Sequence, residues 1–123
     1  MMKKKALVTG SSRGIGRAIA VALAQDGFEV ILHCAGNLAK AEEAKNQIEE
    51  MGGTARILQA DLCDLDATRA LAEQVGQVDV LVLNASLQIR KPWQEITQEE
   101  YTRQMTCNFA SSLLLIQIGR AHV

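Results

Sequence analysis

The feature that most constrains this chain is a glycine-spaced turn between an apolar run and a helical pattern. Residues 6–8 are all apolar, glycines occupy positions 10, 14 and 16, and apolar residues recur at helical spacing from Ile15 onwards. Glycine lets the backbone turn tightly and approach a ligand closely. The first amides of the following helix attract an anion. The stretch predicts a phosphate-binding strand, turn and helix. A flexible turn before a helix is the alternative, which these flanking patterns disfavour.

Strand and helix patterns alternate along the rest of the chain. Short apolar runs predict strands at residues 6–8, 28–32, 55–60 and 78–83. A helical pattern follows each of them, and the last and longest runs from about Gln98 towards Gln117. Such alternation with short connections predicts an α/β fold, a Rossmann-type doubly wound parallel sheet with helices on both faces. The pattern stops after the fourth strand and its long helix, so we expect a truncated version of this fold.

The predicted helices have recognisable caps and apolar stripes. Asn37 and Asp64 are predicted N-caps, and Thr97 with Glu100 fits a capping box. Tyr101 is interpreted as a packing residue of the last helix. The predicted inward positions of the last three helices are Leu38, Ala41, Ala44, Ile48 and Met51, then Thr68, Leu71, Ala72 and Val75, then Met105, Leu113, Leu114 and Ile116.

Composition narrows the possible partners and sites. The net charge of −1 offers no basic surface for nucleic acid, and no apolar stretch is long enough to span a membrane. Three cysteines, Cys34, Cys63 and Cys107, are odd in number and widely spaced, which supports neither a disulfide framework nor a metal site. We therefore expect a reduced, cytoplasmic protein that binds no metal.

Polar and small residues follow each predicted strand. The glycine turn follows the first strand, His33 the second, Asp61 the third and Asn84 the fourth. In open parallel sheets a ligand binds outside the carboxyl ends of the strands. The sequence therefore predicts that four strand exits meet at one ligand site.

Four motifs in this order resemble those of the short-chain dehydrogenases/reductases. The segment from Thr9 to Gly16 is similar to the family's TGxxxGxG motif, close to the version in 3-oxoacyl-acyl-carrier-protein reductases. Asp61-Leu62 is similar to the Asp pair that holds adenine. Residues 83–86 resemble the NNAG motif, with Ser86 in place of the usual glycine, and residues 107–109 resemble the segment that carries a catalytic asparagine.

This resemblance implies a carbonyl reductase that uses a nicotinamide dinucleotide, acts on a small-molecule carbonyl such as a 3-oxoacyl thioester, and forms homotetramers through its long helices. It implies that Asn108 is a catalytic residue that orders a water in a proton relay. The implied cofactor-binding residues are Gly10, Ser11, Ser12, Arg13, Gly14, Ile15, Gly16, His33, Ala35, Asp61, Leu62, Asn84, Ala85 and Ser86.

The residues after the second strand favour one cofactor. NAD-binding folds usually carry a carboxylate there, about 20 residues after the glycines, for the ribose 2′-OH. This chain has His33, Cys34 and Ala35 instead. No carboxylate then repels a 2′-phosphate, and Arg13 can supply a cation to it. We expect NADP(H) rather than NAD(H). A solvated surface Arg13 and a packed strand-end His33 are the alternatives.

Two asparagines also have structural interpretations. Asn84 can stabilise the turn after its strand by binding neighbouring backbone groups. Asn108 lies within a predicted helix, where an inward-facing amide must be hydrogen-bonded, so a buried structural amide is the alternative to its catalytic role. Ser86 replaces the glycine that in the family lets the backbone come close to the cofactor, so the same close approach is not implied at this position.

The residues that would donate a proton are missing. The family uses a tyrosine with a lysine four residues later and a serine on the preceding strand. The single tyrosine, Tyr101, is followed by Met105 instead. We therefore expect the cofactor-binding half of a reductase, with no turnover alone. A non-catalytic dinucleotide-binding module is the alternative. A methyltransferase-like domain is disfavoured by His33, where such a domain normally has an acidic residue.

The last six residues break the apolar pattern. Residues 118–123 match the peptide that one reading frame of a common sequencing-adapter oligonucleotide encodes. We expect residues 1–117 to form an incomplete dinucleotide-binding domain and residues 118–123 to be a non-native tail.

Overall fold

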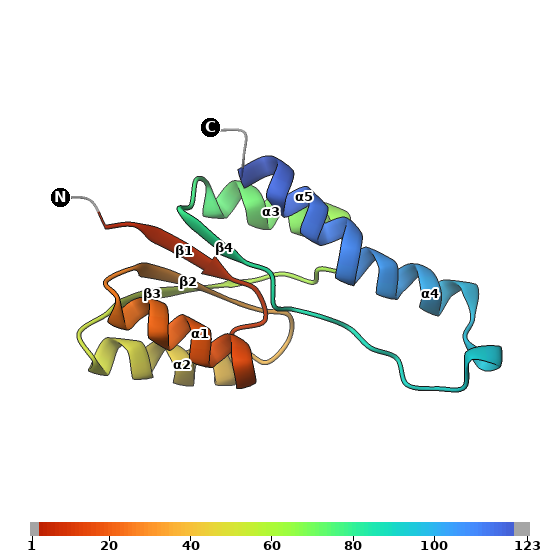
Figure 1. Ribbon diagram of the computed structural model, residues 1–123, viewed down its shortest axis with the longest axis horizontal. Coiled ribbons are helices and arrows are strands. Elements are labelled where there is room, and N and C mark those ends of the chain that lie inside the picture. Colours follow the sequence, from red (N-terminus) through yellow and green to blue (C-terminus); the bar gives the residue numbers. More distant parts are fainter. Residues whose placement is uncertain (1–2, 120–123) are drawn as a thin grey trace.

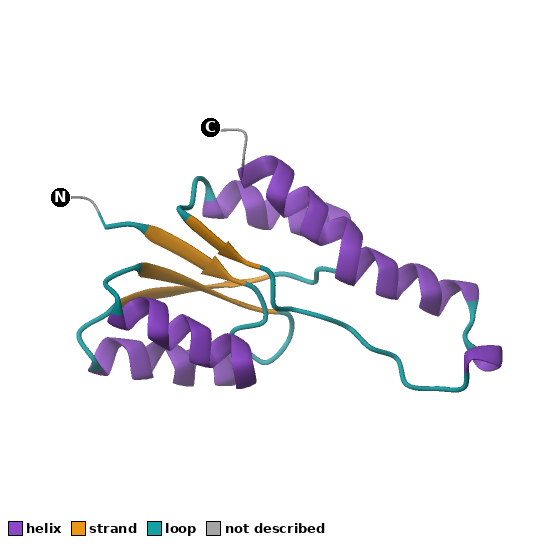
Figure 2. Cartoon of the chain, in the orientation of Figure 1, coloured by secondary structure: helices purple, strands orange, loops and turns teal. Residues whose placement is uncertain are grey.

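The computed structural model describes residues 3–119 of the chain. Strands and helices alternate in its first two thirds (Figures 1 and 2). They are β1 (Lys5–Val8), α1 (Gly14–Gln25), β2 (Glu29–Cys34), α2 (Leu38–Glu50), β3 (Thr54–Gln59), α3 (Leu65–Val75) and β4 (Val80–Val82). After a long loop come a short 3-10 turn η1 (Trp93–Glu95), α4 (Gln98–Met105), the π-helical segment η2 (Thr106–Ala110) and α5 (Ser111–Gly119).

The four strands form one parallel sheet in the order β3-β2-β1-β4. The chain builds outwards from β1 through β2 to β3 and then returns to the other side of β1 with β4. Helices α1 and α2 lie on one face of the sheet, and α3 and α5 lie on the other (Figure 1). The predicted α/β, doubly wound parallel fold is confirmed, with β4 shorter than its predicted range.

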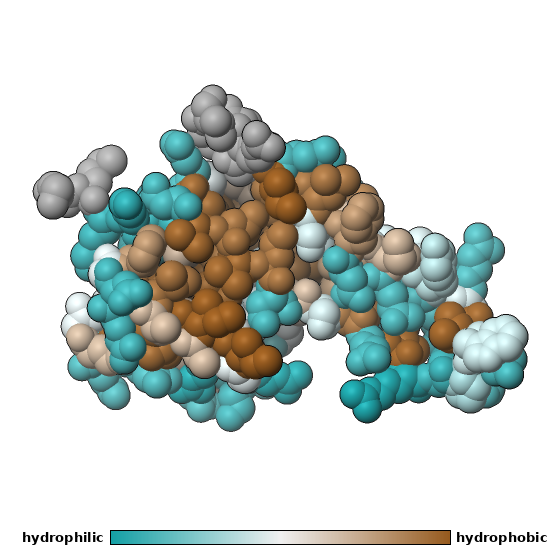
Figure 3. Space-filling view, viewed as in Figure 1, coloured by the Kyte–Doolittle hydropathy of each residue, from teal (hydrophilic) through white to brown (hydrophobic). Residues whose placement is uncertain are grey.

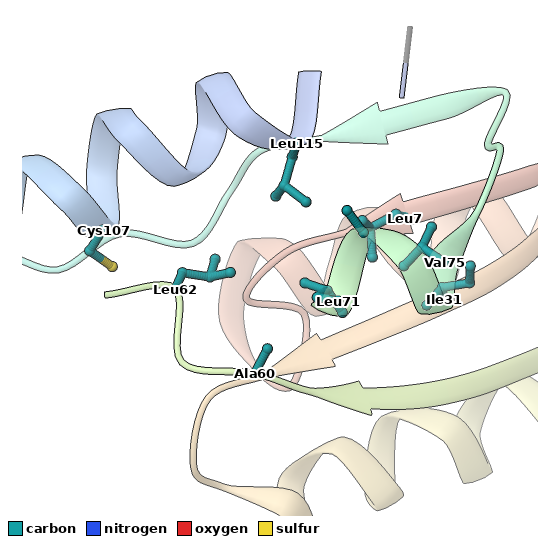
Figure 4. Packing of buried hydrophobic residues seen from close by; sticks show 9 residues of the cluster. Leu7, Ile31, Ala60, Leu62, Leu71, Val75, Cys107 and Leu115 are labelled. Carbon is teal, nitrogen blue, oxygen red and sulfur yellow. The ribbon is translucent and has the colours of Figure 1, made fainter. Parts of the chain in front are cut away.

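Two buried clusters hold the layers together, because alternate residues of a strand point to opposite faces. Val8 and Leu32 pack with Ile48 on the side of α1 and α2. Leu7 and Ile31 pack on the other side with apolar residues of α3 and α5 (Figure 4). The predicted inward residues Ala41, Ala44, Ile48, Thr68, Leu71, Ala72 and Val75 are all buried.

The predicted helix caps are also confirmed. The Asn37 side chain accepts a hydrogen bond from the backbone N–H of Lys40, and Asp64 accepts from two amides of α3. Thr97 and Glu100 form the reciprocal capping box at the start of α4. These contacts fix where the helices begin, and therefore where the loops at the carboxyl edge of the sheet end.

The predicted single long helix over residues 98–117 is interrupted. A π turn separates α4 from α5, and the N–H of Ser111 donates to the carbonyl of Thr106, five residues earlier. The Ser111 hydroxyl donates to the Cys107 carbonyl at 2.7 Å, which satisfies a backbone acceptor inside the wider turn. Apolar periodicity does not reveal one extra residue in a turn, so this interruption could not be predicted.

Several packing predictions for α2, α4 and α5 are wrong. Tyr101, Met105, Leu113 and Ile116 are exposed, and the core contact of α5 is Leu115, which is only 4% exposed. Figure 4 shows Leu115 pointing from α5 towards α3 and the sheet. Leu38 and Met51, at the two ends of α2, are exposed as well. Apolar residues occur on several sides of α5, and the side that carries Leu115 packs on the core, whereas none of the residues of α4 is buried.

Large apolar areas remain uncovered. Figure 3 shows apolar side chains gathered over β4, β1 and α1 and continuing along α5. No helix within residues 3–119 combines the length and apolarity needed to cross a membrane. Residues 118 and 119 end α5, and residues 120–123 of the predicted tail lie outside the described part of the chain.

Candidate functional site

A crevice lies at the carboxyl ends of β1, β2 and β4. It is formed by the turn after β1, the end of β2 with the loop that follows, and the residues directly after β4. Its lining residues are Gly10, Ser12, Arg13, Gly14, His33, Cys34, Ala35, Gly36, Asn37, Asn84, Ala85 and Ser86. This is the edge at which the strand order reverses, where doubly wound folds bind their ligands.

The crevice continues towards the end of β3. A second hollow shares His33, Ala35, Ala85 and Ser86 with it, so the two form one site. The further residues of this hollow are Asp61, Leu62, Cys63, Leu87, Arg103 and Cys107. The four strand exits singled out from the sequence are therefore brought together, as predicted.

Four predicted site residues do not line this site with their side chains. Ser11 and Gly16 are buried beneath it, and the Ile15 side chain is 74% exposed. Asn108 lies in the π segment and binds the loop after β4. That Ser11, Ile15 and Gly16 contact a dinucleotide remains a prediction. Such contacts would have to be made by their backbone atoms or by a rearranged side chain.

The glycine turn is shaped by two different demands. Gly10 and Gly14 adopt φ values of +62° and +60°, a region that suits glycine. Gly16 has ordinary helical geometry, but a Cβ there would overlap the carbonyl oxygen of Gly10 and lie 2.5 Å from Nδ2 of Asn84. The third glycine is therefore required by close packing of α1 against the turn.

Thr9 and Asn84 join the ends of β1 and β4. The Thr9 hydroxyl accepts hydrogen bonds from the backbone N–H groups of Asn84 and Ala85, each at 3.0 Å. The Asn84 amide donates to the Gly10 carbonyl at 3.0 Å. Asn84 thus has the structural role considered from the sequence, while its contact with a cofactor stays a prediction.

His33 ties the turn to β2 and β3. The Gly10 N–H donates to Nδ1 of His33, and Nε2 lies 2.9 Å from the Ala60 carbonyl oxygen. Because Gly10 N–H can only donate and the carbonyl can only accept, the ring is neutral with its proton on Nε2. Burial lowers the pKa of His33, and its hydrogen bond to Ala60 acts in the opposite direction.

His33 is therefore the packed strand-end residue that the sequence offered as one interpretation. The side chain is 1% exposed and both ring nitrogens are bound to backbone groups. A hydrogen bond from the ring to a dinucleotide would require one of these contacts to break. Its backbone is also held, since the His33 N–H donates to the Ser11 hydroxyl at 2.9 Å.

The amino end of α1 is open to an anion. Arg13 is the N-cap residue, and among the described residues no side chain caps the first amides of this helix. The exposed Arg13 side chain lies at the crevice beside Ala35, Gly36 and Asn37. An uncapped helix start, an adjacent guanidinium and a glycine turn form a set of donors suited to phosphate groups.

Asp61 begins the far end of the site. Its Oδ1 accepts a hydrogen bond from the Cys63 N–H at 2.9 Å, which holds the turn after β3, and the residue remains exposed.

The Cys107 thiol faces this turn (Figure 4), and burial together with the neighbouring Cys63 raises the pKa of Cys107 to about 12. A thiol with this pKa is protonated near neutral pH, so Cys107 is a packing residue and not a nucleophile.

Asn108 makes a two-way contact with Leu87. Its Oδ1 accepts from the Leu87 N–H and its Nδ2 donates to the Leu87 carbonyl, both at 2.7 Å. The side chain is exposed, so the sequence-based alternative of a buried amide is wrong about burial. The amide is satisfied by the loop backbone, and its predicted role in a proton relay stays a prediction.

Sequence reasoning missed two residues that shape the site. Thr9 was predicted only as part of the glycine motif, although its hydroxyl holds the start of the loop after β4. Gln104 accepts a hydrogen bond from the Ile89 N–H at 3.2 Å in the same loop. For Thr9 the polar residue ending an apolar strand was an available signal, whereas nothing in the local pattern distinguished Gln104.

The strand order of the sheet and the crevice at the carboxyl ends of its strands define a Rossmann-type α/β fold. Comparison with known proteins narrows the class, since the model of the family described as short chain dehydrogenase matches residues 4–122. The chain therefore belongs to the short-chain dehydrogenase family, a family of oxidoreductases.

Curated relatives agree with this classification. The chain is 39% identical over 111 residues to a 3-oxoacyl-acyl-carrier-protein reductase of Aggregatibacter actinomycetemcomitans, covering 87% of this chain and 46% of the relative. It is 43% identical over 90 residues to the reductase of the same name from Staphylococcus aureus, covering 70% of this chain and 37% of the relative. The chain spans about half the length of the curated relatives it matches, or less.

Solved structures show the same fold. A 3-oxoacyl-(acyl-carrier-protein) reductase from Agrobacterium tumefaciens with NADP bound superposes with a TM-score of 0.89 at 38% identity, covering 96% of this chain and 46% of that one. A short chain dehydrogenase from Burkholderia cenocepacia in complex with NADP gives a TM-score of 0.91 at 33% identity, covering 98% and 51%.

Proposed function

We propose that this chain supplies the dinucleotide-binding half of an NADP(H)-dependent oxidoreductase that reduces a carbonyl to an alcohol, with a 3-oxoacyl thioester or a similar ketone as substrate. The observation that carries the proposal is the crevice at the start of α1, where Arg13 and the uncapped amides of the helix meet. NADPH supplies hydride when bound. The residues of this chain bind and orient the dinucleotide.

The charge of the crevice supports NADP(H) over NAD(H). Among the described residues that line the crevice around Arg13 there is no carboxylate. A 2′-phosphate placed near the turn after β2 would meet the guanidinium of Arg13 without like-charge repulsion. The NADP bound in the Agrobacterium and Burkholderia structures is consistent with this choice.

Replacing Arg13 tests this assignment. We expect Arg13→Leu to weaken NADPH binding about tenfold or more, because a charged hydrogen bond to the 2′-phosphate is lost, and to leave NADH binding nearly unchanged. Isothermal titration calorimetry with both dinucleotides measures the difference.

Arg17→Leu is the matched control. Arg17 lies one turn further along α1, where it donates to Gln47 at 3.0 Å and lies 3.9 Å from a Glu43 oxygen. Its loss should leave the preference for NADPH intact. Equal loss of NADPH and NADH affinity in Arg13→Leu would contradict the proposed contact with the 2′-phosphate.

A non-catalytic dinucleotide-binding module is the second candidate function. Tyr101 is 59% exposed on α4, and the residue four positions later is Met105 rather than a lysine. The only tyrosine of this chain therefore does not supply the proton donor that carbonyl reduction needs. We propose that turnover requires residues additional to those of this chain, and that Asn108 contributes to catalysis in their presence.

We also propose that the complete enzyme is a homotetramer that associates through α4 and α5. An exposed apolar stripe runs along these helices at spacings of three and four residues. It consists of Tyr101, Met105, Phe109, Leu113 and Ile116. A helical stripe of this kind can pair with the same stripe of a second copy about a twofold axis.

Phe109→Lys tests the stripe as an interface. Phe109 is 60% exposed near its middle, and a buried aromatic side chain at an interface commonly contributes most to affinity. We expect the substitution to weaken self-association at least about tenfold by sedimentation equilibrium. Trp93→Lys, which removes an exposed aromatic outside the stripe, is the control. Equal dissociation constants for Phe109→Lys and the unmodified chain would refute this interface.

The cysteines support a reducing compartment. Cys34, Cys63 and Cys107 are all free thiols, and Cys34 and Cys107 are buried. We propose a cytoplasmic location, where thiols stay reduced.

A further inference from the structure

Three side chains on one side of the last helical region bind alternate residues of the loop after β4. Asn108 makes its two-way contact with Leu87, and Gln104 accepts from the Ile89 N–H at 3.2 Å. Glu100 accepts from the Lys91 ammonium, at 3.0 and 3.2 Å for its two oxygens. Figure 2 shows this loop leaving β4 and running alongside α4 in the opposite direction. We call these three contacts the rungs.

The spacings of the two segments match. Four residues of α-helix advance about 6 Å, and two residues of extended chain advance about 6.6 Å. Helix positions 100, 104 and 108 can therefore face loop positions 91, 89 and 87 in register. A step of four residues is slightly more than one turn of α-helix, so residues four apart drift around the helix. The π turn from Thr106 holds more residues than an α-helical turn and so reduces this drift. The interruption of the helix helps to keep Asn108 in line.

The outer rung is held independently. Besides Lys91, the Glu100 carboxylate accepts from the Thr97 N–H at 3.0 Å, as part of the capping box. The start of α4 thus fixes Glu100, and Glu100 in turn fixes Lys91. At the other end, Leu87 directly follows Ser86, and both line the candidate site. The rungs connect the helix cap to the wall of the crevice.

We propose that Gln104, with the Lys91–Glu100 pair, is a positioning element that holds residues 87–91 extended and so sets the wall of the dinucleotide site at Ser86 and Leu87. The hydrogen bond to Gln104 fixes the middle of the segment, which the other two rungs hold only at its ends. The effect on dinucleotide binding rests on the proposed function. The clamping of the loop does not.

Amide hydrogen exchange measured by NMR tests the middle rung. Gln104→Leu keeps the size of the side chain and removes its acceptor oxygen. We expect exchange of the Ile89 amide to rise about tenfold or more, while exchange of β1 and β2 amides stays unchanged. Gln104→Glu retains an acceptor oxygen and should restore slow exchange. Gln98→Leu removes an exposed glutamine of the same helix that lies outside the rungs, and it should have no effect.

A second variant and a binding measurement complete the test. Lys91→Met releases the outer rung at an exposed position, and we expect it to speed exchange of the amides from Leu87 to Lys91 while exchange of β1 and β2 amides stays unchanged. Gln104→Leu should weaken NADPH binding about threefold, in keeping with the loss of one hydrogen bond.

Each outcome distinguishes the two claims. Unchanged Ile89 exchange in Gln104→Leu overturns the positioning role. A parallel rise at β1 and β2 amides also overturns it, because it indicates a general loss of stability. Faster Ile89 exchange in a chain that binds no NADPH supports the clamp and overturns the proposed function.

Discussion

Gly16→Ala is expected to destabilise the chain by about 3 kcal/mol, even though alanine normally favours a helix interior. The new Cβ would overlap the Gly10 carbonyl oxygen and lie 2.5 Å from Nδ2 of Asn84. The first of these neighbours is backbone that cannot rotate away, so α1 must move from the turn. Thermal unfolding should show a midpoint lower by about 10–15 °C, and NADPH binding should be lost with the shape of the turn.

Two comparisons isolate the cause. Gly36→Ala places a methyl group in open space at an ordinary φ and should be nearly neutral. Adding Asn84→Ala to Gly16→Ala removes only the overlap with the Asn84 side chain. The overlap with the Gly10 backbone stays, so we expect no recovery of thermal stability. Full recovery in that double variant would show that the overlap with Asn84, and not the backbone of the turn, makes Gly16 necessary.

His33 is expected to make stability depend on pH in the acid range. Burial lowers its pKa in the folded chain, whereas the unfolded chain keeps the ordinary value near 6.5. Between these two values the unfolded chain binds more protons, so the free energy of unfolding falls as the pH falls. The contribution is complete above pH 6.5 and is lost towards the lowered pKa, with a slope of up to about 1.4 kcal/mol per pH unit.

His33→Leu tests the same residue at fixed pH. It leaves the Gly10 N–H and the Ala60 carbonyl without their partner, which we expect to cost about 2–3 kcal/mol at pH 7.5. The slope below pH 6.5 should flatten in this variant. Urea denaturation at a series of pH values measures both effects. The other histidine provides the control, since His122→Gln should keep the slope. If the free energy of unfolding still falls with pH below 6.5 in His33→Leu, the pH dependence belongs to other titratable groups.

The layered fold could be predicted because its signals are local. The strands follow short apolar runs, and the helix caps depend on contacts within a few residues. The caps at Asn37 and Asp64 and the capping box at Thr97 form as predicted. The meeting of the strand exits followed from a general rule of parallel sheets. The predicted site therefore depended on topology and did not need the positions of individual side chains.

Features that depend on distant partners could not be predicted. The ring of His33 is bound by Gly10 and Ala60, and Gln104 is paired with Ile89 across the loop, contacts that no local pattern encodes. Because apolar residues occur on several sides of α5, periodicity alone did not single out the buried Leu115, and the predicted stripe included the exposed Leu113 and Ile116. Tyr101 lies on α4, none of whose residues is buried, so its predicted packing role is wrong.

An amide-resolved NMR titration of the unmodified chain with NADPH tests the central claim most directly. If the crevice is a dinucleotide site that prefers NADP(H), saturable shifts should appear at residues 10–16 and 84–87, and NADPH should saturate them at a lower concentration than NADH. Shifts that do not saturate, shifts confined to other residues, or NADH binding at least as tight as NADPH binding would contradict the account.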